Sequence, residues 1–410
     1  MTKMTPHQYI EREEKYGAHN YHPLPVVLEK GKGIFMWDVE GKRYFDFLSA
    51  YSAVNQGHCH PRIVKAMTDQ AQKLTLTSRA FHNDVLGEFE EYITKYFGYD
   101  MVLPMNTGAE ADETALKLCR KWGYKVKGIK EDMAKIIVCE GNFHGRTITI
   151  VSMSNDPDSY AGFGPFTPGF VKIPYDDIAA LEKELQDPNV AGFILEPIQG
   201  EAGVYVPADG YLKKAYELCK AKNVLFIADE VQTGIARTGK LLACDHENVH
   251  PDILILGKAV SGGVMPVSCV LANKEIMLTI KPGEHGSTFG GNPIACKVAI
   301  EALQVVKDEK LAENAERLGK IFREEMLKFK NEGKSEMVDV VRGKGLLNAI
   351  IVKPKNGKTA WDVCLAMRDL GLLAKPTHDH IIRFAPPLVI TEAELREAIA
   401  IIQKAFRMFE

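Results

Sequence analysis

The chain has 410 residues, which is too long for one simple hydrophobic core, so we expect two or three domains. Hydrophobic residues make up 46% of the sequence and charged residues 26%, which excludes a disordered chain and is typical of a globular protein. The formal net charge of −3 argues against general attraction to nucleic acid or membrane surfaces, and no apolar run approaches the roughly 18 residues of a membrane span.

Residues 1–59 begin with a charged helical stretch and continue through an extended loop with prolines. Residues 26–48 alternate in the manner of a β-meander, and Pro61 then opens a helix with an apolar face. The first residues have no apolar signal core and are too acidic for a typical transit peptide. The eight cysteines are scattered without a C-x-x-C pair, which indicates reduced thiols. These features lead us to expect a cytoplasmic protein.

From about residue 85 to 290, helical and strand-like patterns alternate as in an open α/β sheet. The predicted helices are 85–97, 109–125, 178–185 and 211–222, and the predicted strands are 101–105, 134–139, 192–196, 224–228, 253–256 and 267–271. From about 295 one long helix leads into an α+β tail, with strands at 338–342, 346–352 and 381–384 and helices near 361–370 and 392–409. We therefore expect an N-terminal segment (1–59), a large domain (60–310) and a small C-terminal α+β domain (311–410).

Two of the predicted strands, 224–228 and 253–256, are followed by Asp229 and by Lys258, respectively. A lysine held in apolar surroundings is partly desolvated, which favours its neutral, nucleophilic form. The working hypothesis is that Lys258 forms a Schiff base with pyridoxal phosphate and that Asp229 keeps the pyridine nitrogen protonated. A solvated, inert lysine is the alternative, because most lysines are exposed.

Polar turns that contain glycine follow several predicted strands, at the strand ends where α/β sheets bind ligands. Thr107 and Glu110 match a helix capping box. The same turn can also place a phosphate on the free N–H groups of a helix N-terminus, with Gly108 allowing close approach. Both interpretations remain open, and they are compatible.

The loop 142–147 contains Phe143, His144 and Arg146, side chains that suit a flat ring and a carboxylate. A solvent-facing loop with Phe143 turned into the core is the alternative. Glu196 and Glu201 end another apolar strand and suit acid–base groups or arginine partners. An ordinary strand-ending turn explains the glutamates equally well.

A cluster of hydroxyls and glycines at 285–292 either donates hydrogen bonds to a phosphate or simply joins a loop to a helix. The pairs His58/His60 and His378/His380 lack a companion ligand at zinc spacing, so we expect core or loop histidines and no metal site. The glycine patterns of dinucleotide-binding and P-loop folds are absent from the sequence.

Nearly the whole chain, from about residue 16 to 409, resembles the class III (ω-amino) aminotransferases of pyridoxal-phosphate fold type I. The motifs described above lie in the stretches that carry this resemblance. Within that family the chain is similar to the ornithine δ-aminotransferases. The stretches are 16–21, 47–61, 106–111, 164–166, 196–203, 228–234, 256–263, 281–288, 342–349 and 382–388. The resemblance implies an α/β fold: a large domain with a mostly parallel seven-stranded sheet covered by helices, and a smaller α+β domain formed by the N- and C-terminal segments.

The resemblance also implies which residues bind the cofactor. Lys258 corresponds to the Schiff-base lysine and proton shuttle, Asp229 to the partner of the pyridine nitrogen, and Gln232 to the partner of the cofactor's phenolic oxygen. The remaining positions are Phe143, which stacks on the ring, Gly108 and Ala109, which hold the phosphate, and Thr288, whose hydroxyl reaches the phosphate from the neighbouring subunit. A homodimer with its active site at the interface is therefore implied.

The substrate residues are implied in the same way. Tyr21 and Arg146 resemble the groups that fix the α-amino and α-carboxylate ends of ornithine, and Tyr51 matches a further substrate-binding position. Arg383 resembles the arginine that binds the α-carboxylate of 2-oxoglutarate, and Glu201 resembles the gate that pairs with Arg383 while ornithine is bound. A switchable ion pair lets one site accept an amine and later a dicarboxylate without leaving an arginine buried and unpaired.

The implied reaction moves the δ-amino group of L-ornithine to 2-oxoglutarate, giving glutamate 5-semialdehyde (pyrroline-5-carboxylate after cyclisation) and glutamate. The near alternatives are acetylornithine and 4-aminobutyrate aminotransferases, and Tyr21 with its sequence context favours free ornithine. His144 stands where some ornithine enzymes have a bulkier aromatic, and many acetylornithine enzymes share the stretch 143–147, so this stretch does not separate the two. A mutase or racemase on the same fold, or a non-catalytic metabolite-binding protein, represents a different class.

Overall fold

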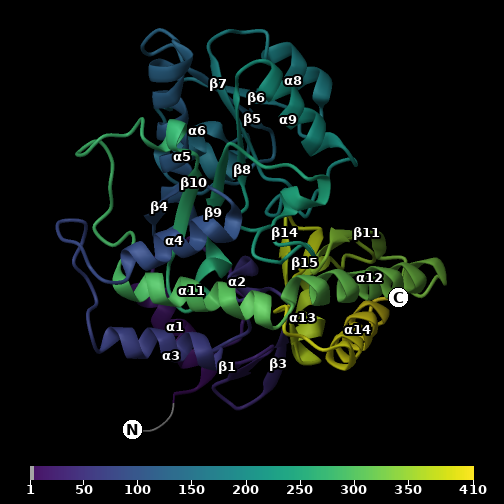
Figure 1. The fold of residues 1–410 in the computed structure, drawn as a ribbon. Coiled ribbons are helices and arrows are strands. Elements are labelled where there is room, and N and C mark those ends of the chain that lie inside the picture. The colour runs from purple at the N-terminus through teal and green to yellow at the C-terminus, as the bar shows by residue number, and fades with distance from the viewer. Residues whose placement is uncertain (1–3) are drawn as a thin grey trace.

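Three β-sheets organise residues 4–410, the part of the chain that the computed structural model describes. A seven-stranded sheet occupies the upper half of Figure 1, and two four-stranded sheets lie below it, among the N-terminal (purple) and C-terminal (yellow) parts of the chain. The molecule is α/β with one large, mostly parallel sheet, so the fold class predicted from the sequence is confirmed.

The large sheet has the strand order β4-β10-β9-β8-β7-β5-β6. Of these strands β10 runs antiparallel to both of its neighbours, and the other pairs are parallel. The strands are β4 (Met101–Met105), β5 (Lys135–Cys139), β6 (Phe170–Ile173), β7 (Val190–Leu195), β8 (Leu225–Asp229), β9 (Ile253–Leu256) and β10 (Ser268–Ala272). Strands β7, β8 and β9 are buried along their whole length, as expected where helices cover both faces.

Alternate side chains of the large sheet point into two different cores, because successive residues of a strand face opposite sides. Ile136 and Ile194 pack with α5 (Gly108–Trp122) in one core. Ile137 and Phe193 pack with α8 (Ile178–Glu184) and α9 (Tyr211–Ala221) in the other. The other elements of this region are α3 (Pro61–Ala71), α4 (Leu86–Phe97), α6 (Ile148–Met153), α7 (Pro157–Tyr160), α10 (Lys274–Met277), α11 (Pro293–Asp308), a π-helical turn η1 (Gly123–Lys127) and the 3₁₀ turns η2 (Ala243–Glu247) and η3 (Lys258–Ser261).

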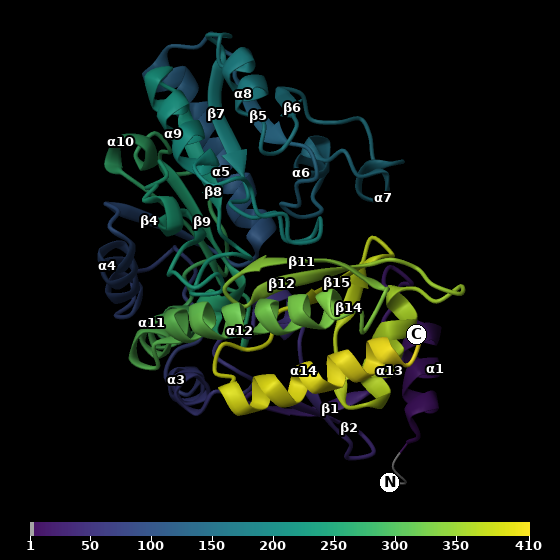
Figure 2. The same cartoon turned by 90° about the vertical axis from the view of Figure 1, so that its right-hand side faces the viewer.

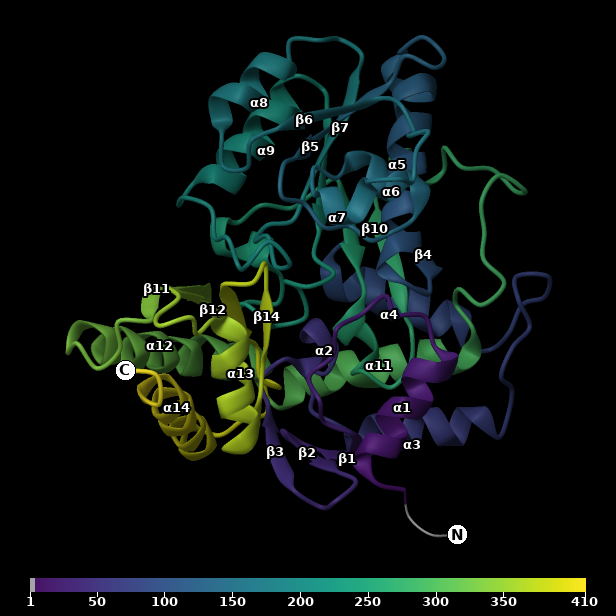
Figure 3. The same cartoon turned by 180° about the vertical axis from the view of Figure 1, so that it is seen from behind.

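The first four-stranded sheet joins the two ends of the chain. After α1 (Pro6–Tyr16), strands β1 (Leu28–Lys32), β2 (Phe35–Asp38) and β3 (Arg43–Asp46) form the predicted antiparallel meander, and β13 (Leu372–Leu373) pairs in parallel with β3. Just beyond β3, Phe47 N donates to Leu373 O (2.9 Å), and Ala385 N donates to Phe47 O (2.8 Å). The short helix α2 (Ser49–Ser52) follows and lies between this sheet and the large sheet (Figure 3).

The second four-stranded sheet, with the order β11-β12-β15-β14, belongs to the C-terminal part of the chain. Its strands are β11 (Val338–Lys344), β12 (Leu347–Val352), β14 (Lys375–Thr377) and β15 (Ile381–Phe384), and all its pairs are antiparallel. Figure 2 shows α12 (Leu311–Asn331) below this sheet and α14 (Glu392–Arg407) below α12, with α13 (Ala360–Asp369) beside them.

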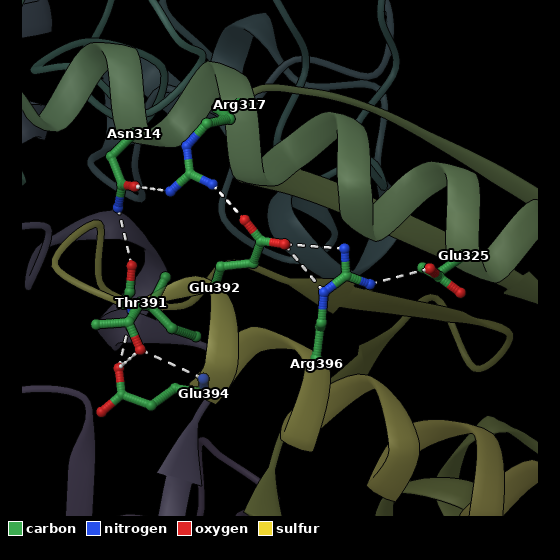
Figure 4. A network of polar contacts seen from close by, with 8 residues as sticks. Asn314, Arg317, Glu325, Thr391, Glu392, Glu394 and Arg396 are labelled. Atoms are coloured by element: carbon green, nitrogen blue, oxygen red, sulfur yellow. Dashed lines mark hydrogen bonds and ion pairs between the residues drawn. The ribbon is translucent and has the colours of Figure 1, made fainter.

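A polar network connects α12 to the start of α14 (Figure 4). Arg317 of α12 donates to Glu392 (2.6 Å), which also accepts from Arg396 (2.9 Å), and Arg396 reaches back to Glu325 of α12 (3.1 Å). Because these side chains are largely exposed, water screens the ion pairs, and the buried apolar faces of the two helices supply most of the stability.

The predicted strands of the large sheet lie within two residues of their observed bounds. The single long helix predicted from about residue 295 is wrong: α11 and α12 are separate helices, and Lys310 between them has a left-handed φ of 51°. The short edge strands β6, β13 and β14 were not predicted. All eight cysteines are free, and among the helices of residues 4–410 none is long and apolar enough to span a membrane.

Candidate active site

Lys258 lies just beyond β9, a strand whose four residues are all buried. It begins the turn η3 with a left-handed φ of 45°. Burial lowers the pKa of Lys258, and the charges of Asp229 and Glu196 oppose this shift. The lysine therefore provides a neutral, nucleophilic amine more readily than a surface lysine does.

Asp229 is the last residue of β8, and its pairing with Ile255 of β9 places it at the same sheet edge as Lys258. Its Oδ1 accepts from Val231 N (2.9 Å), and its Oδ2 accepts from His144 Nδ1 (2.7 Å). Only 4% of Asp229 is exposed. Both oxygens of this buried side chain therefore have hydrogen-bond partners.

Three further buried groups surround Asp229: His144, Asp112 and Glu196. Asp112 of α5 places Oδ1 3.7 Å from His144 Nδ1. Burial raises the pKa of Asp112 well above its usual range and raises the pKa of Glu196 to about 7. Burial works to lower the pKa of His144, but the hydrogen bond to Asp229 and the nearby negative charges raise it overall. Asp112 was not predicted from the sequence, because nothing in its local sequence distinguishes it from other helical carboxylates.

The N-terminus of α5 lies beside these groups. Thr107 Oγ1 accepts from Glu110 N (3.2 Å), and Glu110 Oε2 accepts from Thr107 N (2.8 Å), so the predicted capping box is confirmed. The N–H groups of Gly108 and Ala109 precede the first intrahelical hydrogen bond and point out of the helix end. A Cβ on Gly108 would lie 3.1 Å from Val231 Cγ1, so glycine keeps this approach open.

Phe143 and Gln232 complete a cavity of about 170 Å³, which we call the cofactor cavity. Phe143 N donates to Glu196 Oε1 (2.8 Å), and a Cβ on Gly200 would collide with the side chain of Gln232. The cavity is lined by Gly108, Ala109, Asp112, Phe143, His144, Gly145, Glu196, Asp229, Val231, Gln232 and Lys258. All the predicted cofactor residues therefore converge here except Thr288, which is exposed and lies outside this cavity in the single chain.

A second cavity of about 540 Å³, the substrate cavity, contains all the residues predicted to bind substrate: Tyr21, Tyr51, Arg146, Glu201 and Arg383. Arg383 Nη1 donates to Glu201 Oε2 (2.8 Å), and only 4% of Arg383 is exposed. The guanidinium is therefore buried, whereas 30% of the Glu201 side chain remains exposed.

The two cavities adjoin. Arg146 lines the substrate cavity, and its Cζ lies 5.4 Å from the ring of Phe143 in the cofactor cavity. The charges of Glu201 and Arg383 also act on Lys258. On the far wall, the ring of Tyr51 lies 5.0 Å from Arg383 Cζ, and burial raises the pKa of Tyr51.

A turn of left-handed helix carries Tyr51. Its residues Ser49, Ala50, Tyr51 and Ser52 have φ values of 49°, 46°, 61° and 72°. Left-handed helix is unfavourable for L-residues by roughly 1–2 kcal/mol each. The hydroxyls of Ser49 and Ser52 are buried and find no hydrogen-bond partner among residues 4–410. The sequence does not predict this shape, because the segment contains no glycine or asparagine to indicate a left-handed backbone.

Asp46 contacts the start of this turn, and His58 contacts Asp46. Leu48 N and Ser49 N both donate to Asp46 Oδ1 (2.8 Å each), and His58 Nε2 donates to Asp46 Oδ2 (2.7 Å). The expectation of a core or loop histidine holds for His58, and His60 likewise pairs with Glu309 (2.9 Å). No role was predicted for Asp46 from the sequence.

The sequence matches the family described as Aminotransferase class-III over residues 16–406. A relative from Rattus norvegicus, named mitochondrial ornithine aminotransferase, is 65% identical over 403 residues, which cover 98% of this chain and 91% of that protein. The structure of the ornithine aminotransferase from Toxoplasma gondii, with pyridoxal phosphate at partial occupancy in its active site, has a TM-score of 0.97 at 53% identity and covers 100% and 95% of the two chains. An acetylornithine aminotransferase structure from Elizabethkingia anophelis has a TM-score of 0.91 at 61% identity and covers 99% and 100%.

The relatives contradict the cytoplasmic location expected from the sequence. The rat relative is named mitochondrial, as are relatives from Drosophila melanogaster and Caenorhabditis elegans that are 66% and 58% identical. The expectation is wrong because composition and reduced cysteines separate reducing from oxidising compartments and do not identify an organelle.

Proposed function

Because this chain belongs to the class-III aminotransferase family, we propose that it transfers the δ-amino group of L-ornithine to 2-oxoglutarate with pyridoxal phosphate as cofactor. The products are glutamate and glutamate 5-semialdehyde, which cyclises to pyrroline-5-carboxylate. The observation that carries the proposal is the Arg383–Glu201 pair in one cavity with Arg146. Such a cavity can hold one carboxylate throughout and a second one when the pair opens.

The donors of the cofactor cavity fit pyridoxal phosphate. The free N–H groups of Gly108 and Ala109 suit the phosphate, and the face of Phe143 suits the ring. Asp229 suits a protonated ring nitrogen, and the amide of Gln232 suits the ring oxygen. When bound, this cofactor supplies the sink for the electron pair that remains when a substrate carbon loses its proton.

In this proposal Lys258 is the proton carrier. Its Nζ removes the proton from the δ-carbon of ornithine as a general base and returns a proton as a general acid. The lowered pKa of Lys258 favours the free amine that this step needs. Asp229, held by His144 and Val231, keeps its negative charge fixed within the same cavity.

The substrate cavity would hold ornithine by the end that does not react. Tyr21 and Arg146 would bind the α-amino and α-carboxylate groups, with Tyr51 in the cavity wall, so that the δ-amino group points toward Lys258. While ornithine is bound, Glu201 neutralises Arg383. In the second half-reaction Glu201 swings away, and Arg383 binds the α-carboxylate of 2-oxoglutarate.

We also propose a homodimer with the active site at its interface. Thr288 is exposed in the single chain, and two large apolar side chains, Phe289 (56%) and Phe81 (74%), are exposed as well. Exposed side chains of this kind are often covered by a partner. The hydroxyl of Thr288 would then reach the phosphate in the partner's cavity. Within each subunit, residues 60–310 would bind the cofactor, and residues 1–59 and 311–410 would close the substrate cavity.

A panel of half-reactions tests the function. The cofactor-loaded enzyme is mixed with ornithine, N-acetylornithine, 4-aminobutyrate or lysine in the absence of an oxo acid. The loss of the enzyme's visible absorption at about 400 nm is then followed. Ornithine should react fastest, because it alone combines a δ-amino group with free α-amino and α-carboxylate groups. A faster reaction with N-acetylornithine would identify that compound, and not ornithine, as the amino donor. The 61% identical acetylornithine aminotransferase structure from Elizabethkingia anophelis supports this second candidate.

A further inference from the structure

The left-handed turn Ser49–Ser52 carries Tyr51 into the substrate cavity, although its own residues disfavour that backbone shape. We propose that Asp46 and His58 form a positioning pair that holds this turn and thereby sets the discrimination between amino donors. Neither residue lines the cofactor cavity or the substrate cavity. The inference rests on the proposed function and adds to it residues that act through Tyr51.

The carboxylate of Asp46 fixes the entrance of the turn. Because Leu48 N and Ser49 N both donate to Oδ1 (2.8 Å each), two successive peptide groups are oriented by one oxygen. The next bonds depend on the same two residues: Tyr51 N donates to Leu48 O (3.0 Å), and Ala53 N donates to Ser49 O (2.8 Å). Loss of the carboxylate would therefore release the turn from its first residue onward.

His58 in turn fixes the carboxylate. Its backbone exchanges two hydrogen bonds with Gly33 (2.8 and 3.0 Å), and its Nε2 donates to Asp46 Oδ2 (2.7 Å). Gly31 of β1 packs against the imidazole so closely that a Cβ there would lie 2.9 Å from His58 Cγ. The ring therefore has little freedom to rotate, and both oxygens of Asp46 have fixed partners.

The turn transmits this order to two functional groups. It places the ring of Tyr51 5.0 Å from Arg383 Cζ in the wall of the substrate cavity. On its other side α2 packs against η3, the turn that begins at Lys258. A displacement of about 1 Å at such a position is enough to change a rate roughly a hundredfold.

A double-mutant cycle between His58 and Tyr51 tests the inference. Half-reaction kcat/KM values for ornithine and for 4-aminobutyrate are measured in wild type, His58→Ala, Tyr51→Ala and the double variant. His58→Ala should lower the ornithine/4-aminobutyrate ratio about tenfold, because a displaced Tyr51 alters the cavity wall that holds the unreactive end of ornithine, and 4-aminobutyrate has no α-amino group at that end. In the Tyr51→Ala background the same substitution should change the ratio by less than about twofold, because its effect passes through Tyr51. Equal losses in both backgrounds would show a general structural effect and overturn the positioning pair.

His60→Ala is the matched control, because it removes a second imidazole–carboxylate pair two residues away and should leave the ratio unchanged. Gly31→Ala supplies an independent perturbation: the methyl group should push the imidazole aside and lower the ratio in the same direction even if His58→Ala does not fold. His58→Gln, which keeps a donor, should restore part of the ratio. An unchanged ratio in both Gly31→Ala and folded His58→Ala contradicts the pair. The ratio can be measured whichever donor the wild-type enzyme prefers. A wild-type preference for a donor other than ornithine would contradict the proposed function, and this outcome is distinct from a failure of the positioning pair.

Discussion

The cofactor cavity and the substrate cavity adjoin, but they are assembled differently. The cofactor cavity is lined by residues between 108 and 258, which lie at the ends of strands of one sheet or on the helix and loops that follow them. The substrate cavity brings together residues from 20 to 383, which belong to all three sheets and their connections. In the proposed function, groups at a single sheet edge would carry out the chemistry, and the more distant segments would select the substrate. Substitutions in the cofactor cavity should therefore lower the rate of the reaction, and substitutions in the substrate cavity should change the preference among substrates.

The largest effect is expected at Lys258. Lys258→Ala removes the group proposed to move the proton, so kcat should fall by roughly 10³-fold or more. Steady-state turnover with ornithine and 2-oxoglutarate provides the measurement. Because the N-terminus of α5, Phe143 and Asp229 remain, the variant should still retain pyridoxal phosphate after dialysis. Turnover within tenfold of wild type would contradict the role of Lys258 in the mechanism. It would also contradict the proposal that the cofactor cavity supplies the chemistry.

Glu196 makes the stability of the cofactor cavity depend on pH. Burial raises its pKa from 4.5 to about 7, so the folded protein prefers the protonated acid. The stability that this group contributes is fully present below pH 4.5 and is lost as pH rises through 7. In the cofactor-free protein, Glu196→Gln should therefore gain stability relative to wild type between these pH values, by at most about 3 kcal/mol.

Urea unfolding of both cofactor-free proteins at pH 5 and pH 8 checks this expectation. Wild type should lose more stability than Glu196→Gln over this interval. Parallel curves for the two proteins would mean that the folded protein does not hold Glu196 as the neutral acid.

A smaller effect is expected at Glu201 in the substrate cavity. Glu201→Ala leaves Arg383 without its ion-pair partner, so a dicarboxylate should bind more easily in the first half-reaction. Glutamate should therefore compete with ornithine about tenfold better, with little change in cofactor retention. Half-reaction rates with glutamate provide the measurement, and Glu201→Gln is the conservative control. An unchanged rate with glutamate would contradict the gate.

The cofactor side of the site was the part that the sequence could predict best. Buried parallel strands appear as uninterrupted apolar runs, so the strand bounds around Asp229 and Lys258 were placed within one residue. The capping box at Thr107 is likewise a local signal and was confirmed. Spacing alone gave no reason to place Tyr21 beside Arg383, because their proximity depends on contacts between distant segments. That part of the prediction came from the family resemblance.

What remained hidden from the sequence was set by tertiary contacts. The helix predicted from residue 295 is interrupted at Lys310, and no glycine or proline there indicates the break. The left-handed turn at Ser49–Ser52 likewise has no local signal, and the carboxylate that anchors it belongs to the preceding strand. Asp112 faces His144 only because α5 packs against the sheet. These features follow from the assembled fold and lie outside any short window of sequence.

The smallest expected effect concerns the strain of the left-handed turn. Ala50 is exposed and has a φ of 46°, a conformation that glycine adopts without a steric penalty. Ala50→Gly should therefore stabilise the folded protein by about 0.5–1 kcal/mol, because the relief of strain exceeds the extra freedom of glycine in the unfolded chain. Ala50→Val is the matched control and should destabilise, since a β-branched side chain tolerates positive φ poorly. Thermal unfolding of the cofactor-free proteins gives both values.

If Asp46 and His58 hold the turn, Ala50→Gly should also keep the wild-type preference among donors, because the anchor at Leu48 and Ser49 is intact. A glycine variant that loses this preference would show that the stiffness of the turn, and not its anchor, positions Tyr51.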